Sequence, residues 1–411
     1  MLIIGLQQKI NVKGKLNIER AENMEAKAIE DIFIKILRSE LTETELDSSV
    51  KEQLTPDVVS ALYALADHHD LAHVIFSSLY KCGLKKDDAL YSKFEQKAIM
   101  SVYRNEQIKY AFAQICDIFD KASIPYIPLK GSVIRPYYPQ ESMRTSCDID
   151  ILVKEVNLKA AIDALVQKGF KCGERNYHDV SLFSEANVHL ELHFNIQENI
   201  DKLDAVLKDA WHYANLTEGS RYKFTDEFFV FHMFAHMSYH FLSGGCGIKP
   251  LMDIWIMEHK MGITYECAKE LIEKAGIFQF ATEISKLAEI CFSGEPKDEF
   301  SDSILSYIFS GGVYGTSQNK IAVKKSKSKS TLLYALQRLF MPYKSMVILY
   351  PILRKLPFLL PFCWIARWCK MLFGGKAKNT IRELKTANNV SDDKINTLTM
   401  MRERLGLLNY K

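Results

Sequence analysis

The sequence predicts an α+β protein in which a small mixed β-sheet core is flanked by N-terminal and C-terminal helical regions. Three observations lead to this prediction. Apolar residues recur every three or four positions through 20–115 and again through 224–291, which is the period of amphipathic helices. Between these regions, 124–196 alternates short apolar runs typical of strands with one helical segment. A chain of 411 residues that is 48% hydrophobic is also long enough for several domains.

We expect four parts along the chain. They are an N-terminal helical region at 1–105, a core at 106–210, a helical region at 211–316 that closes the cleft, and a basic linker with an aromatic and basic helical segment at 317–411. In the first part, Pro56 and Gly83 separate the expected helices, which lie at 28–37, 58–66, 71–81 and 91–119. The core is expected to contain strands at 124–129, 148–153, 180–184 and 188–196, with a helix at 156–168.

A tight turn follows the first expected strand of the core. Ile124, Ile127 and Leu129 suit a short buried strand, and Gly131 and Ser132 then turn the chain into a helix. The first backbone N–H groups of a helix have no partner within it and can receive a phosphate. The turn is therefore a candidate phosphate site.

Two carboxylates alternate along the next expected strand. Asp148 and Asp150 lie two residues apart, so a strand places both side chains on one face while Ile149 and Ile151 enter the core. Carboxylates held close together favour a hard cation such as Mg²⁺, which also takes ligands from phosphates. A polar edge on an ordinary strand has the same pattern, but the Gly-Ser turn upstream favours the metal site.

These motifs resemble the nucleotidyltransferase superfamily, whose pattern is a hydrophobic residue, Gly, Gly or Ser, a spacer, and then Asp-hydrophobic-Asp or Glu. The closer resemblance is to the bacterial uncharacterised nucleotidyltransferase family. This resemblance is found in the segment IPYIPLKGSVIRPYYPQESMRTSCDIDILV. It extends to VHLELHFNI and, more weakly, to FHMFAHMSYHF followed by GIKPLMDIWI. The resemblance implies a fold like that of DNA polymerase beta. The spacer at 133–147 is longer than in the compact form of the motif, which leaves the position of Arg144 open.

A third carboxylate is implied on a neighbouring strand, and Glu191 is the candidate. In 188–195 the apolar residues alternate with His189, Glu191, His193 and Asn195, so these four share one face. A half-buried strand with a solvated face would look the same. The resemblance favours a site role for Glu191 and His193, because the family tends to carry Glu-hydrophobic-His here.

The resemblance implies Mg²⁺-dependent transfer of a nucleoside monophosphate from an NTP, with ATP as the expected donor and Mn²⁺ as the alternative ion. Asp148 and Asp150 would hold the metal, and Glu191 would be a third ligand or the general base. Gly131 and Ser132 would hold the β- and γ-phosphates. Lys130 and Arg144 would be charge partners of the departing pyrophosphate, although each could equally be a surface cation. The acceptor would be a hydroxyl of an unidentified small molecule, saccharide or protein.

Three further histidines lie four residues apart after the core. His232, His236 and His240 would share one face of a helix. This spacing can bind zinc, but the Glu that follows the first His in a metalloprotease helix is absent. We expect instead that the helix packs on the core and offers a polar face to the cleft, with His236 and Asp253 as possible cleft residues.

Composition limits the partners and the compartment. A net charge of +3, without a basic patch beside the motif, makes nucleic acid an unlikely partner. Nine scattered cysteines without a Cys-x-x-Cys pair fit reduced thiols in the cytoplasm. The initial MLIIGLQQK is too short an apolar run for a secretory signal and lacks a basic start.

The C-terminal part has a different character. KKSKSKS at 324–330 reads as a basic linker, and 332–373 interleaves tryptophans and tyrosines with Arg and Lys. Its longest apolar run, 356–366, is too short and too rich in proline to cross a bilayer. The segment is either a peripheral membrane contact at the inner membrane face or, as we favour, a helix that packs on the protein or another subunit.

Three functions therefore remain open. The first is an active nucleotidyltransferase. The second is a catalytically inactive protein of the same fold that binds nucleotide or a partner in a regulatory role. The third is an envelope-associated scaffold that works through 332–373, and liposome binding would favour it.

Overall fold

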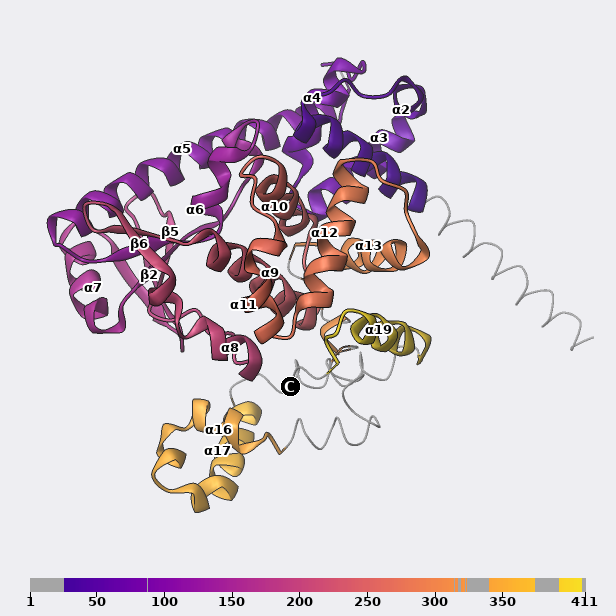
Figure 1. The fold of residues 1–411 in the computed structure, drawn as a ribbon. Coiled ribbons are helices and arrows are strands. Elements are labelled where there is room, and N and C mark those ends of the chain that lie inside the picture. The colour runs from indigo at the N-terminus through magenta and orange to yellow at the C-terminus, as the bar shows by residue number, and fades with distance from the viewer. Residues whose placement is uncertain are drawn as a thin grey trace, which may run out of the picture. The chain divides into compact units, whose positions relative to one another are not determined.

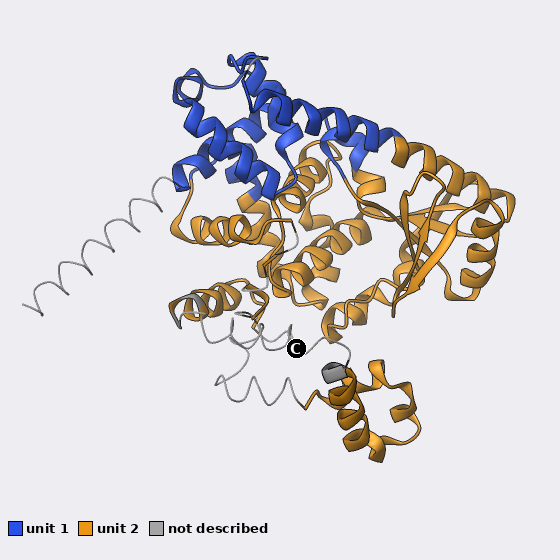
Figure 2. Cartoon of the chain, turned by 180° about the vertical axis from the view of Figure 1, so that it is seen from behind, with its two compact units in different colours: residues 1–106, 135–145, 288–296 blue, residues 107–134, 146–287, 297–411 orange. Residues whose placement is uncertain are grey.

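The computed structural model describes residues 26–86, 88–313, 315–316, 319–321, 323, 340–373 and 392–408. The expected linker at 324–330 and the N-terminal apolar run lie outside these residues. The chain divides into two compact units (Figure 2): unit 1 holds 1–106, 135–145 and 288–296, and unit 2 holds 107–134, 146–287 and 297–411. This division crosses the four parts expected from sequence, because unit 1 takes a segment from the middle of the expected core.

Unit 1 is helical, as the apolar spacing predicted. Thr55 accepts a hydrogen bond from the backbone N–H of Val58, and Pro56 takes the first helical position, where its missing N–H costs nothing. Short 3-10 turns at Arg135–Tyr137 (η1) and Glu141–Met143 (η2) also belong to this unit. Its helices are 26–42, α2 (Ser48–Gln53), α3 (Pro56–His68), α4 (Ala72–Lys81) and the first part of α5 (Tyr91–Lys121).

Unit 2 is built on a seven-stranded sheet with the order β3-β4-β5-β2-β1-β7-β6. Figure 1 labels its strands β2, β5 and β6. The central strand β2 runs antiparallel to β1 and parallel to β5, so the sheet is mixed, as predicted. The strands are β1 (Tyr126–Pro128), β2 (Asp148–Val153), β3 (Lys171–Arg175), β4 (Asp179–Phe183), β5 (His189–His193), β6 (Ala214–Glu218) and β7 (Arg221–Phe224).

Three of these strands were not expected from sequence, and two lie beyond residue 210, where the core was expected to end. β6 and β7 form a hairpin around Gly219, whose φ of +53° suits a residue without Cβ. β3 pairs with β4 at one edge of the sheet, and all five of its residues are exposed. Such strands lack the apolar alternation that reveals a half-buried strand.

One face of the sheet carries the hydrophobic core of unit 2. Ile149, Ile151 and Val153 of β2 lie in the same buried cluster as Leu190 and Leu192 of β5. The helices α5 and α7 (Leu158–Gln167) pack against these strand residues and add Ile115, Phe119, Leu158, Ala161 and Leu165 to the cluster. Because strand residues alternate between faces, burying these side chains turns the intervening polar residues to the opposite face.

The expected helices after the core are also present. α9 is capped by Thr225, and most of its residues are buried. α10 contacts both α9 and the short helix α6 that follows β1. The further helices of unit 2 are α6 (Gly131–Ile134), α8 (Asp201–Leu207), α9 (Asp226–Leu242), α10 (Ile248–His259), α11 (Lys269–Lys274), α12 (Phe278–Phe292), α13 (Glu299–Gly311), α16 (Tyr343–Leu349), α17 (Leu360–Phe373) and α19 (Asp392–Arg404). The end of α12, from residue 288, belongs to unit 1.

Within the described residues, no helix is both long and apolar enough to cross a membrane.

Candidate active site

The carboxylates of β2 and β5 meet on the polar face of the sheet. Parallel pairing sets Asp148 opposite His189 and Asp150 opposite Glu191. Residues that lie opposite each other in paired strands share a face, so the alternation predicted for each strand separately becomes one polar surface. The structure thus brings together Asp148, Asp150, Glu191 and His193 in the way the sequence predicted.

Asp150 is the most strongly paired residue of this surface. Its Oδ1 lies 2.9 Å from Nε2 of His193 and 3.2 Å from Nζ of Lys130. His193 Nε2 also lies 3.6 Å from Oε2 of Glu191. All of these side chains are largely buried, so solvent screens their attraction only weakly. One carboxylate oxygen of Asp150 therefore accepts hydrogen bonds from two cationic side chains.

Burial and these neighbours separate the protonation of the three carboxylates. Burial, together with the charges of Asp150 and Glu191, raises the pKa of Asp148 to about 6. Burial would also raise the pKa of Asp150, but Lys130 and His193 hold it well below its usual range. The nearby imidazolium of His193 lowers the pKa of Glu191. Asp150 and Glu191 are therefore ionised at neutral pH, and Asp148 titrates close to it.

The cationic partners respond to the same charges. Burial alone would lower the pKa of His193, yet its hydrogen bond to Asp150 and the nearby carboxylate of Glu191 raise it to about 9. Burial likewise opposes the charge of Lys130, but Asp150 and Asp148 keep its pKa above the ordinary value. Both groups are thus cations at neutral pH. They neutralise the carboxylate cluster in the absence of other ligands.

Glu191 is the centre of the possible metal site. Among the described residues, its carboxylate belongs to one group with Asp148 and His189 and to another with Asp150 and His193, and in each group the ligand atoms lie within 4.8 Å of one another. Carboxylate oxygens on one surface match the preference of Mg²⁺ and Mn²⁺ for oxygen ligands. Each group also contains a histidine, so this surface could hold a metal ion with Glu191 as a shared ligand, and the identity of the ion stays a prediction.

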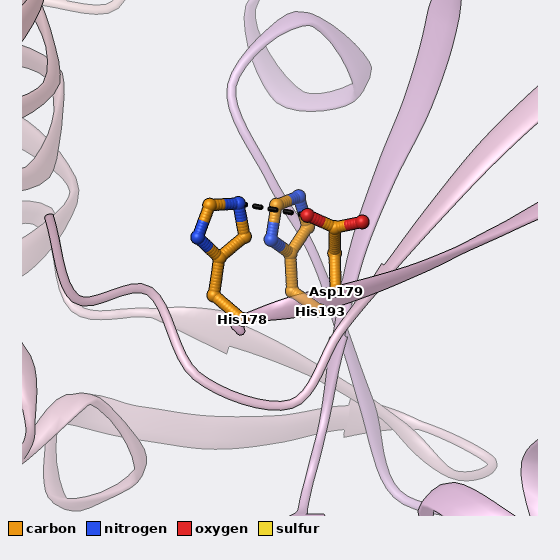
Figure 3. Close-up of side chains that lie close together, drawn as sticks. All are labelled: His178, Asp179 and His193. Carbon is orange, nitrogen blue, oxygen red and sulfur yellow. Dashed lines mark ion pairs between the residues drawn. The ribbon is translucent and has the colours of Figure 1, made fainter. Parts of the chain in front are cut away.

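A third group of possible ligands lies at the β4 edge of this surface. Figure 3 shows His178, Asp179 and His193 with their side chains together, and His178 Nε2 lies 2.8 Å from Asp179 Oδ2. The rings of His178 and His193 are nearly parallel, with centroids 5.5 Å apart. Sequence analysis missed His178 and Asp179. Asp179 faces His193 across the β4–β5 pair, and such cross-strand pairing leaves no periodic signal in either segment.

The turn before α6 places Lys130 beside the carboxylates. Lys130 has a φ of +40°, an uncommon backbone conformation for a residue with a side chain. The N–H of Ser132 donates to the carbonyl of Leu129, and the N–H groups of Val133 and Ile134 donate to that of Lys130. These N–H groups are engaged within the turn, and α6 has only four residues. The role of Gly131 and Ser132 in phosphate binding stays a prediction.

Two further predicted residues, Arg144 and Asp253, belong to other segments than the strands of the cluster. Arg144 belongs to unit 1, where its guanidinium donates to the carbonyl of Thr145 and its own carbonyl accepts from Arg135. Asp253 belongs to unit 2 and is buried in α10, the helix that contacts α6. The proposed roles of both residues stay predictions.

The histidines of α9 do share one face, as predicted, and they connect to a carboxylate that sequence analysis missed. Glu198 Oε1 lies 2.9 Å from Nδ1 of His236, and Nε2 of His236 lies 3.0 Å from Nε2 of His240. Burial raises the pKa of Glu198 to about 7 although Lys130 and His193 lower it, so Glu198 lies within the electric field of the site. Glu198 follows β5 in a segment without helix or strand, where no period could reveal it.

The sequence profile of the uncharacterised nucleotidyltransferase family matches residues 56–293, which is more than half of the chain. The chain belongs to this nucleotidyltransferase family. No curated protein and no solved structure matches it. The matched residues include every residue of the carboxylate surface, Lys130 and the three α9 histidines.

Proposed function

We propose that the protein transfers a nucleoside monophosphate from an NTP, with ATP as the expected donor, to a hydroxyl of a small molecule, saccharide or protein. The observation that carries this proposal is the Glu191-centred carboxylate surface with Lys130 in contact with Asp150. In the reaction the acceptor oxygen bonds to the α-phosphorus, the bond from that phosphorus to the bridging oxygen breaks, and pyrophosphate leaves. Membership of the nucleotidyltransferase family supports this chemistry.

Asp148, Asp150 and Glu191 would hold Mg²⁺ or Mn²⁺. The ion would neutralise phosphate charge and orient the triphosphate. Because Asp150 forms ion pairs with both Lys130 and His193, a metal ion that binds Asp150 competes with these two cationic side chains. We propose that Lys130 then turns its ammonium from Asp150 to the β- and γ-phosphates, so that the positive charge stays in the site.

Two carboxylates could take the proton from the acceptor hydroxyl. The pKa of Glu191 is lowered by His193, which suits a ligand better than a base. Glu198 has a pKa of about 7, close to the value at which a general base works best at neutral pH, and His236 orients its carboxylate. We propose Glu198 as the base and Glu191 as the third ligand.

A thermal-shift titration with ATP, CTP, GTP and UTP, each with and without Mg²⁺, tests the proposal. A ligand at about a hundred times its dissociation constant adds roughly 2.7 kcal/mol to the free energy of unfolding. We expect one nucleotide to raise the melting temperature only with Mg²⁺. The Asp148→Asn/Asp150→Asn double variant should lose this shift.

Glu174→Gln/Glu218→Gln is a matched control for charge, because both side chains are exposed outside the cluster. This control should keep the full shift. A shift that persists in the Asp148→Asn/Asp150→Asn variant would place the nucleotide elsewhere. If no nucleotide shifts the wild type, the inactive regulatory alternative replaces the enzyme.

We also propose that the protein works in the cytoplasm. None of the nine cysteines is in a disulfide bond, and four of them are exposed. Exposed cysteines outside disulfide bonds persist where glutathione keeps thiols reduced. Alkylation of intact cells followed by mass spectrometry would show whether Cys147 and Cys172 are reduced in place.

A further inference from the structure

The segment 340–373 combines positive charge with exposed apolar side chains. It contains five Lys or Arg residues and no Asp or Glu. The surrounding stretch 303–382 continues this bias, with 14 basic residues and no acidic one. The rest of the chain then holds 39 basic against 50 acidic residues, a formal charge of −11. The small net charge of the whole protein therefore conceals one strongly basic region.

The described part of this region has its own small core. Met346, Leu353 and Cys363 are buried together, and the Trp364 indole N–H donates to the carbonyl of Met341 at 3.0 Å. These contacts join α16, two short 3-10 turns (η6, Pro351–Arg354, and η7, Pro357–Leu359) and α17. Cys363 and Trp364 define the face of α17 that points to this core.

A second apolar face of the same elements is exposed. Phe358, Phe362 and Ile365 are 70%, 66% and 52% exposed, and their spacing of four and three residues places them along one side of η7 and α17. A helix that is apolar on both sides is unusual in water. The large apolar side chains exposed in this segment are Phe340, Tyr343, Leu349, Ile352, Leu356, Phe358, Phe362 and Ile365.

We propose that 340–373 docks on an anionic lipid surface and lies in its plane. The cations would meet the lipid headgroups while Phe358, Phe362 and Ile365 enter the acyl boundary, as in amphipathic segments that bind membrane interfaces. Nucleic acid would also attract the charge, but exposed leucine and isoleucine side chains cannot stack on bases as aromatic rings do. The aliphatic part of the surface therefore favours lipid.

Flotation of the full-length protein with vesicles tests this docking. Phosphatidylglycerol mixed into phosphatidylcholine should bind the protein at least about tenfold more strongly than phosphatidylcholine alone, because each basic residue near an anionic surface adds attraction. Phe358→Ser/Phe362→Ser should weaken the binding about tenfold or more, since it removes inserted apolar area and leaves the charge unchanged. Arg354→Gln/Lys355→Gln should reduce the preference for phosphatidylglycerol-containing vesicles over phosphatidylcholine vesicles.

Val156→Ser/Leu216→Ser is the matched control, because these apolar residues are 88% and 59% exposed elsewhere in unit 2. It should bind vesicles as the wild type does. The proposal would be overturned if the wild type did not bind anionic vesicles. It would also be overturned if Phe358→Ser/Phe362→Ser and Val156→Ser/Leu216→Ser lost vesicle binding equally. Tight binding of a fluorescent single-stranded RNA that is unaffected by Phe358→Ser/Phe362→Ser would also overturn it in favour of nucleic acid. None of these readouts depends on nucleotidyl transfer.

Discussion

Nε2 of His193 lies 2.9 Å from Oδ1 of Asp150, the oxygen that also accepts a hydrogen bond from Lys130. Asp150 is thus neutralised from two sides before any ion or nucleotide binds. Buried ion pairs of this kind lose much stability when one partner is removed, because the other charge stays uncompensated. The same contact makes the stability of the protein depend on the protonation of His193.

We predict that the protein loses stability in mild alkali through His193. Its pKa is about 9 in the fold against about 6.5 when unfolded, so its stabilising charge is complete below pH 6.5 and disappears as the pH rises through 9. The free energy of unfolding should fall by up to roughly 3 kcal/mol across that range. His193→Gln, compared with wild type by urea unfolding at each pH, should remove this slope.

His212→Gln is the control for that experiment, since the His212 side chain is 85% exposed. It should keep the wild-type slope. The assignment to His193 fails if His193→Gln and wild type lose equal stability between pH 6.5 and 9.

Mild acid should destabilise the protein through α9. Burial lowers the pKa of His232 to about 3. In the unfolded chain His232 therefore binds a proton near pH 6.5, whereas in the folded protein it stays neutral at that pH. Between pH 7.5 and pH 5 the wild type should lose about 2 kcal/mol through this group. His232→Leu should lose correspondingly less over the same range in urea unfolding. Parallel pH curves for the two proteins would contradict the prediction.

Lys130→Met should weaken NTP binding. The variant removes the ammonium that we expect to move from Asp150 to the phosphates, and a hydrogen bond to a charged group contributes about 1.5–3 kcal/mol. That range corresponds to roughly a 10- to 100-fold rise in the dissociation constant, measured by calorimetry with Mg²⁺ present. Lys121→Met makes the same charge change at a side chain that is 72% exposed, and it should bind as the wild type does. Equal affinities for both variants would exclude Lys130 from the phosphate site.

The carboxylates and His193 of the site could be predicted because they lie on regular strands. A period of two fixed the face of Asp148, Asp150, Glu191 and His193 before their pairing was known. Glu198 lies in an irregular segment, and only the tertiary fold brings it to His236. For the same reason the polar strands β3, β6 and β7 gave no signal, because neither of their faces is a continuous apolar row.

Glu198→Gln should separate the proposed base from the ligands. The variant keeps a hydrogen-bonding group beside His236 but cannot accept a proton, so we expect turnover to fall by about 10²–10⁴ while NTP affinity stays within about twofold. Pyrophosphate release with water as a slow acceptor provides the assay. The wild-type rate should rise with pH through an apparent pKa of about 7, the value for Glu198, and this acid limb should vanish in the variant. Glu218→Gln, on the exposed strand β6, should keep it. An unchanged limb in Glu198→Gln would assign the proton transfer to another group, with Glu191 the next candidate.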